Sequence, residues 1–192
     1  NASDVFVPTA ALIKGVLLNG AVDMTGTSTA PPNRYEGWGR IHLENSLFFE
    51  GDARRIVVED ARDHFTTSSR TIFRRMYRGS GDPAGGPLKV TLVWTDYPAS
   101  PAASIALVND LDLVVVDAEG GETYLGNSFD ATTGLSVPGG SPDELNNVEM
   151  VVLPSDLEGL FEVKVVPRRI VKPAQGFALV VGGAITEEEL VL

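Results

Sequence analysis

Two short stretches decide the fold: Leu92-Val93-Trp94-Thr95-Asp96 and Val108-Asn109-Asp110-Leu111-Asp112-Leu113. In both, apolar residues alternate with other residues at every second position, which predicts β-strands. In the second strand the leucines point to one face, and Asp110 and Asp112 point together to the other. Asp96 ends the first stretch, so we expect three carboxylates close together. Because such groups repel one another, we expect a bound hard cation, and calcium accepts many oxygen ligands in flexible geometry.

The composition limits the partners. The 192 residues carry 15 basic and 26 acidic side chains, a formal net charge of −11. A nucleic-acid footprint requires the opposite sign, so we expect no nucleic-acid partner. The chain has no cysteine, which excludes disulfides, thiol catalysis and zinc–thiolate sites. It has no apolar run long enough to span a membrane.

From about residue 50 onward the sequence has the pattern of a mainly β protein. Short alternating segments are separated by turns rich in glycine, proline and aspartate. We expect strands at 54–59, 70–78, 88–95, 110–116, 122–126, 147–153, 160–167 and 176–182. Strands without helical periodicity predict an antiparallel β-sandwich of jelly-roll type. Trp94 shares a strand face with Leu92 and Val90, so we interpret it as a core residue rather than a platform for a sugar.

The first quarter of the chain does not fit that pattern. Residues 8–21 predict a helix, with Pro8 in the first turn and Asn19-Gly20 at the C-terminal end. Apart from Lys14 this helix is apolar nearly all round, and such helices are buried on several sides. The residues that follow are strand-like. We therefore interpret the helix as part of a core that lies mostly outside this chain.

A glycine-rich segment follows the helix. Gly37 and Gly39, on either side of Trp38, indicate a tight turn against the indole ring. Residues 41–47 then indicate a short helix or turn. The sequence Gly26-Thr27-Ser28 we interpret as part of a loop, not as a nucleophile motif.

Taken together, these segments resemble the C-terminal part of subtilisin-like serine peptidases (subtilases). The helix pattern Pro-x-x-x-Leu-Ile-Lys-x-x-Leu-x-Asn-Gly-Ala, followed by Gly-Trp-Gly-Arg-Ile, is similar to the end of their catalytic domain and covers residues 8–47. Four ordered motifs resemble the C-terminal β-sandwich of large bacterial subtilases: Leu-Val-Trp-Thr-Asp at 92–96, Leu-Val-Asn-Asp-Leu-Asp-Leu at 107–113, Tyr-Leu-Gly-Asn at 124–127 and Asn-Asn-Val-Glu at 146–149. The resemblance spans roughly residues 8–183.

The resemblance implies a division of the chain and a role for it. Residues 1–48 would be the end of the catalytic domain, 49–185 the β-sandwich and 186–192 a frayed tail. In subtilases the catalytic Asp, His and Ser precede this helix, so we expect no catalytic residue here. The parent would be a secreted or cell-surface endopeptidase that hydrolyses peptide bonds in protein substrates. Its sandwich would stabilise the catalytic domain of the same polypeptide.

Only two histidines are available as a base, and we expect neither to act as one. A serine mechanism needs a base within hydrogen-bond reach of the nucleophile and a carboxylate that orients it. The sequences around His42 and His64 indicate neither arrangement, so we interpret both as structural or exposed.

The resemblance adds weight to the calcium hypothesis, because these C-terminal sandwiches commonly carry calcium. The candidate ligands are Asp96, Asp110, Asp112, Asn147 and Glu149. Further oxygen donors lie at strand ends and in loops: Asn109, Asn127, Asp130 and Asn146. An alternative for Asp110 and Asp112 is that they are charged residues on an edge strand, where charge discourages aggregation.

Two other roles stay open. The sandwich would instead bind substrate, cell wall or polysaccharide if its aromatic side chains gathered on one face, but the tyrosines are scattered: Tyr35, Tyr77, Tyr97 and Tyr124. The helix at 8–21, exposed without its catalytic domain, would favour a homodimer. The arginines between 54 and 78 we interpret as a solvent face that pairs with Glu50, Asp52, Glu59, Asp60 and Asp63.

Overall fold

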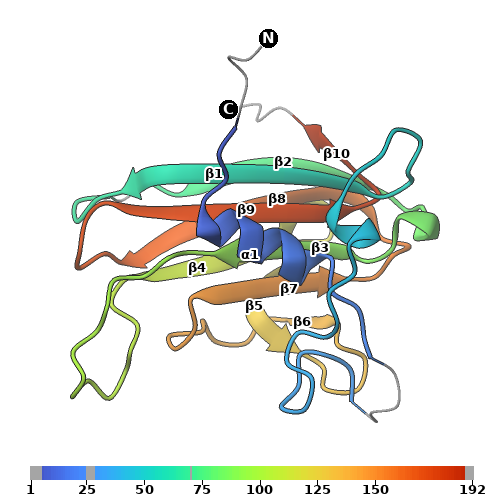
Figure 1. Ribbon diagram of the computed structural model, residues 1–192. Coiled ribbons are helices and arrows are strands. Elements are labelled where there is room, and N and C mark those ends of the chain that lie inside the picture. The colour runs from blue at the N-terminus through green and yellow to red at the C-terminus, as the bar shows by residue number, and fades with distance from the viewer. Residues whose placement is uncertain (1–5, 25–28, 70, 189–192) are drawn as a thin grey trace.

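Two antiparallel sheets face each other in the computed structural model, which describes residues 6–24, 29–69 and 71–188 (Figure 1). The first sheet contains, in order of neighbours, β1 (Arg55–Phe65), β9 (Gln175–Gly183), β3 (Leu88–Val93) and β7 (Val148–Leu153). The second contains β10 (Ile185–Glu188), β2 (Phe73–Ser80), β8 (Glu158–Arg169), β4 (Asp110–Asp117), β5 (Thr123–Phe129) and β6 (Ser136–Pro138). Strands β1 to β4 and β7 to β9 alternate between the sheets, which is the jelly-roll arrangement. The predicted mainly β sandwich is confirmed.

Every predicted strand is present, and the differences lie at strand ends. β1 continues to Phe65, past an irregularity in its pairing after Ala61, where Asp63 has a φ of 51°. The frayed extension expected from residue 186 is instead a paired strand as far as Glu188. This strand, β10, pairs with β2, and Ile185 at its start is 3% exposed because its side chain joins the core. Residues 189–192 lie outside the described residues.

The core between the sheets comes from the inward-facing residues of both. Leu92 on β3 and Leu111, Leu113 on β4 are fully buried there, as the alternation predicts. Trp94 is also buried in this core, and its Nε1 donates a hydrogen bond to the Asn109 carbonyl over 3.0 Å. Trp94 is thus the core residue that the sequence indicates.

The helix α1 (Ala10–Asn19) lies across the outer face of the first sheet, over β9 and β3 (Figure 1). Thr9 caps its N-terminus, because Thr9 Oγ1 accepts a hydrogen bond from the Leu12 N–H over 3.1 Å. Gly15 permits close contact with the sheet, since a Cβ there would lie 3.1 Å from Val180. Only this side of the helix is buried. The opposite side, where the sequence predicts further burial, leaves Ile13 51% exposed.

The chain between α1 and β1 packs against the end of that helix. Gly37 and Gly39 have φ angles of 60° and 98° and turn the chain around the half-buried Trp38, as predicted. The short 3-10 helix η1 (Glu44–Ser46) then contacts α1, and a second, η2 (Pro83–Gly85), precedes β3. Residues 25–28, which include Ser28, lie outside the described residues.

Candidate functional site

Three buried carboxyl groups mark the start of β4 and the facing strand β7. Asp110 and Asp112 are 3% and 6% exposed, and Glu149 is 1% exposed. β5 pairs only with residues 114–116 of β4, so the first residues of β4 have no strand on that side. Glu149 reaches across from the other sheet, and its Oε2 accepts the hydrogen bond of the Leu113 N–H over 2.7 Å. All three acidic side chains are therefore buried, although Asp110 and Asp112 lie where β4 has no neighbouring strand on one side.

One oxygen of each carboxyl group has no partner. Asp110 Oδ1, Asp112 Oδ1 and Glu149 Oε1 are buried without a hydrogen bond in the described part of the chain. Burial disfavours the ionised form, so it raises the pKa of Glu149 to about 9 and that of Asp112 to about 6. Burial also raises the pKa of Asp110. In the absence of a cation, Glu149 is therefore protonated at neutral pH.

Two basic residues, Arg168 and Arg169, offset part of this charge. Arg168 Nη1 lies 3.5 Å from Asp112 Oδ2, and Arg168 Nη2 lies 3.3 Å from Glu144 Oε1. Its guanidinium is substantially exposed, which weakens the attraction. The neighbouring Arg169 donates to the Leu107 carbonyl, and its positive charge opposes the rise in the pKa of Asp110. The buried acids thus retain uncompensated oxygens that a cation would satisfy.

Carboxylate oxygens are the ligands that a hard cation prefers. In this structure, however, the three carboxylates do not point toward one common position. Within residues 6–24, 29–69 and 71–188, no three or more acidic or histidine side chains are arranged to hold a metal. Asp110 and Asp112 point away from the core that holds Leu111 and Leu113, whereas Glu149 lies between the sheets. A cation bound here therefore requires these carboxylates to turn toward each other.

Asp96, the third predicted partner, has a structural role in the loop before β4. Its Oδ2 accepts the Val108 N–H over 2.6 Å, and its Oδ1 accepts the N–H groups of Asn109 and Tyr97, each over 2.8 Å. Both carboxylate oxygens are thus occupied by backbone donors. The side chain fastens the long loop between β3 and β4 rather than joining the buried acids.

The amide candidates are also engaged with the backbone. Asn147 Nδ2 donates to the Trp94 carbonyl over 2.9 Å. Asn127 Nδ2 donates to Asp143 Oδ2 and to the Val148 carbonyl, and Asn127 Oδ1 accepts the Met150 N–H. Asp130 accepts hydrogen bonds within its own turn. These side chains hold loops to strands.

Asn109, named from the sequence only as a possible oxygen donor, is the centre of a buried hydrogen-bond network that the sequence does not predict. Its Nδ2 donates to the Lys172 carbonyl over 2.7 Å and to Gln175 Oε1 over 2.8 Å. Its Oδ1 accepts the N–H groups of Val171 and Lys172. Asn109 is 0% exposed and Gln175 is 3% exposed. The only signal in the sequence is a polar residue, Gln175, beside a strongly apolar strand.

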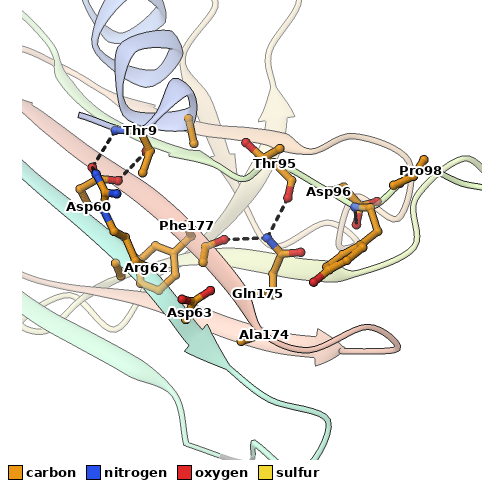
Figure 2. A pocket seen from close by; sticks show the side chains of 14 residues that line it. Thr9, Asp60, Arg62, Asp63, Thr95, Asp96, Pro98, Ala174, Gln175 and Phe177 are labelled. Atoms are coloured by element: carbon orange, nitrogen blue, oxygen red, sulfur yellow. Dashed lines mark hydrogen bonds and ion pairs between the residues drawn. The ribbon is translucent and has the colours of Figure 1, made fainter. Parts of the chain in front are cut away.

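A cavity of about 420 Å³ opens beside the start of α1 (Figure 2). Its polar wall groups bind one another: the Asp60 carboxylate accepts hydrogen bonds from the Thr9 N–H over 2.9 Å and from Thr9 Oγ1 over 2.5 Å. Gln175 Nε2 donates to the Thr95 and Gly176 carbonyls (Figure 2). Arg62 and Asp63 lie at its rim. With their hydrogen bonds directed to each other, these groups do not form a reactive cluster.

The two histidines make local contacts. The His64 ring packs edge-on against Phe65, Phe73 and Phe177. His42 Nδ1 accepts a hydrogen bond from the Asn45 N–H over 3.4 Å. Both rings therefore have local structural contacts.

Several arginines form ion pairs on the surface, and one of the tyrosines is buried. Arg75 pairs with Glu59 and Arg62 with Asp60, as predicted, while Arg74 pairs with Glu162 on β8. Of the four tyrosines, Tyr77 is buried in the core. It is therefore not part of any exposed aromatic surface.

An exposed apolar surface surrounds α1 and η1. It consists of side chains that are each at least 42% exposed: Ile13, Leu43, Leu47, Phe48, Phe49 and Val58. We call this set the outer apolar face. Val58 lies on the same side of β1 as Ile56, which packs against the helix cluster, and Ser46 of η1 contacts Gly20 at the end of α1. Large contiguous apolar surfaces are typical of interaction sites.

Comparison with known proteins gives two relatives. No protein-family model matches the chain. The chain is similar to the Serine protease/ABC transporter B family protein tagA of Dictyostelium discoideum, with 31% identity in an alignment 191 residues long that covers 94% of this chain and 10% of that protein. It is also similar to the Serine protease/ABC transporter B family protein tagD of the same organism, with 27% identity in an alignment 185 residues long that covers 76% of this chain and 10% of that protein.

The similarity covers only a small part of each relative. The chain spans about 10% of the length of the curated relatives it matches. No helix in the described ranges is long and apolar enough to cross a membrane. The chain is thus related to a short region of much longer proteins that are named serine proteases.

Proposed function

We propose that this chain is a non-catalytic β-sandwich module of a longer, secreted serine endopeptidase of the subtilisin-like type. The module packs against the protease domain of the same polypeptide and stabilises it. Peptide-bond hydrolysis belongs to that domain. The observation that carries the proposal is the outer apolar face on a chain related to proteins named serine proteases.

The outer apolar face supports the protease domain as its occupant. It surrounds α1, the helix with only one side buried, and it includes two adjacent phenylalanines, Phe48 and Phe49, that are 49% and 57% exposed. Covering large apolar side chains is favourable by about 25 cal/mol for each Å² removed from water. A second module that packs there also covers the free side of α1, which carries Ile13.

Calcium is the second part of the proposal. Asp110, Asp112 and Glu149 would hold it, because each carries one buried oxygen without a partner. The bound ion would supply positive charge to groups that otherwise stay protonated or repel each other. Asp96 and Asn147 are less suited, because their side chains already bind backbone groups.

A binding experiment with two separate pieces tests the docking. The protease domain of the same polypeptide is mixed with this chain, and association is measured by sedimentation velocity together with the half-life of protease activity on heating. We expect association and a longer half-life. Phe48→Asn weakens both, because it places a polar group in the outer apolar face.

A matched control uses an exposed apolar residue outside that face. Val171 is 52% exposed, so Val171→Asn changes exposed apolar area to a similar extent. Wild-type association with Val171→Asn supports the proposal. Equal loss in both variants, failure of the wild-type pieces to associate, or peptide hydrolysis by this chain alone contradicts it. A homodimer of the wild-type chain that Phe48→Asn dissolves would assign the face to a second copy instead.

A further inference from the structure

Two basic side chains meet behind the end of α1, where Arg54 and Lys89 line one cavity. Arg54 Nη2 donates to Asn19 Oδ1 over 2.7 Å, and Lys89 Nζ donates to the Ala21 carbonyl over 2.6 Å. Asn19 ties this site to the sheet, because its Nδ2 donates to the Lys89 carbonyl over 2.9 Å. The helix end, β3 and the residue before β1 thus place two cations side by side.

Neither cation forms an ion pair with an acidic side chain of the described residues. In the described ranges the ion pairs involve other basic residues, namely Arg62, Arg74, Arg75, Arg78, Lys164 and Arg168. The partners of Arg54 are neutral, and besides Asn19 they are the carbonyl groups of Asn45, Gly85 and Pro87. On a chain with a net charge of −11, two basic side chains in one cavity that form no ion pair among the described residues are unusual.

Their charges are costly in this position. Burial, together with the positive charge of Arg54, lowers the pKa of Lys89 to about 8. Burial lowers the pKa of Arg54 to about 10. A half-buried cation is stabilised by an opposite charge held against it, and among the described residues no ion pair provides one for Arg54 or Lys89.

The space for that anion is present. The cavity has a volume of about 350 Å³ and is bordered by Ala21, Pro31, Gly86 and Pro87 in addition to the two cations. One water occupies about 30 Å³ of liquid, so the cavity admits a small ion. Asp23 also lines the wall, and its negative charge favours a ligand of low charge.

We propose that this cavity binds a small oxyanion of low charge, such as a monocarboxylate, between the Lys89 ammonium and the Arg54 guanidinium. Lys89 has three N–H donors and uses one of them for Ala21. The Arg54 Nη1 bonds to Gly85 and Pro87 are long, 3.5 Å each, so this nitrogen is available for a better acceptor. Charge-assisted hydrogen bonds to an oxyanion are the strong type.

A purely structural role explains less. A cation near the C-terminal end of α1 interacts favourably with the helix dipole, which accounts for the contact of Lys89 with Ala21. It does not account for a second cation beside the first, since each raises the cost of the other. The proposal is independent of the protease role and of calcium.

Calorimetric titration of this chain with sodium acetate at pH 7 tests the site, with sodium chloride at equal ionic strength as the reference. We expect saturable binding of acetate at one site and weaker binding of chloride. Lys89→Met is expected to weaken acetate binding about tenfold or more, since it removes the ammonium and leaves Arg54. Lys172→Met is the matched control, because Lys172 is exposed and does not line the cavity.

Further measurements distinguish a loss of acetate binding from a loss of folding. Arg54→Lys retains the charge and tests the guanidinium geometry, and near-ultraviolet circular dichroism verifies that each variant is folded. Acetate affinity should fall as the pH rises through about 8, because Lys89 then loses its proton. Identical responses to acetate and chloride, or wild-type affinity in folded Lys89→Met, overturn the proposal.

Discussion

The Glu149 carboxylate accepts a hydrogen bond from the Leu113 N–H over 2.7 Å, and this bond joins β7 of one sheet to β4 of the other. The same carboxyl group lies against Gly126 of β5, where a Cβ would be 2.2 Å from Glu149 Oε2. Glycine at position 126 therefore provides the room for a buried acid. The sandwich is built around this acidic side chain at one end of its core.

The first prediction concerns pH in the presence of a calcium chelator. The pKa of Glu149 is raised to about 9 in the fold, from 4.5 for an ordinary glutamate. The folded state therefore holds a proton that the unfolded chain releases in this window. The free energy of unfolding should fall as the pH rises from 4.5 toward 9, at most by about 1.4 kcal/mol per pH unit for this group.

Glu149→Gln isolates that contribution. The amide retains an oxygen that accepts the Leu113 N–H and does not ionise. Urea unfolding at several pH values should give a flatter pH profile for Glu149→Gln than for the wild type. Parallel profiles would show that Glu149 does not titrate in this range.

The second prediction concerns calcium. If the ion binds the buried acids, a hundredfold excess over its dissociation constant raises the free energy of unfolding by about 3 kcal/mol. Thermal unfolding in calcium and in chelator should then differ for the wild type and much less for Asp112→Asn. Asp156 is exposed, so Asp156→Asn is the control and should respond like the wild type. An unchanged wild-type midpoint removes the calcium proposal and leaves the fold as described.

The third prediction concerns Asn109. Truncation by Asn109→Ala removes two donors and an acceptor from the buried network and leaves the Val171 and Lys172 N–H groups without a partner. We expect a loss of about 2–4 kcal/mol in chemical unfolding. Asn146 is exposed, so Asn146→Ala should cost less than about 1 kcal/mol. Similar losses in both would show that the network contributes little.

The fourth prediction concerns Gly126. Gly126→Ala introduces a Cβ within 2.2 Å of Glu149 Oε2 and should destabilise the sandwich by about 1–3 kcal/mol. Combining it with Glu149→Ala removes the clashing carboxyl group, so the double variant should lose less than the sum of the two single variants. Additive losses would mean that the two residues do not share this space.

The periodicity of the sequence was sufficient for the sandwich but not for its shortest strands. Leu92 and Leu111 alternate with other residues, and such alternation identifies both a strand and its inward face. β6 has three residues and β10 has four, which is too few for a periodic signal. They form because β5 and β2 offer an unpaired edge.

The candidate site was predicted less completely. The alternation shows that Asp110 and Asp112 share a face, and the structure places both in buried positions. It does not reveal which donors reach a side chain across the loop, so Asp96 was grouped with them although it binds backbone N–H groups. Asn109 and Gln175 are 66 positions apart and meet only in the folded chain.

The packing of α1 on the first sheet has a practical consequence for shortened forms of this protein. Ala11 and Leu12 cover Val93, Val148, Ala178 and Val180 on the outside of the first sheet. A polypeptide that starts at residue 49 would expose these aliphatic side chains to water. Molecules without the helix would therefore aggregate through this surface. Shortened forms of the sandwich made for expression should therefore retain the helix.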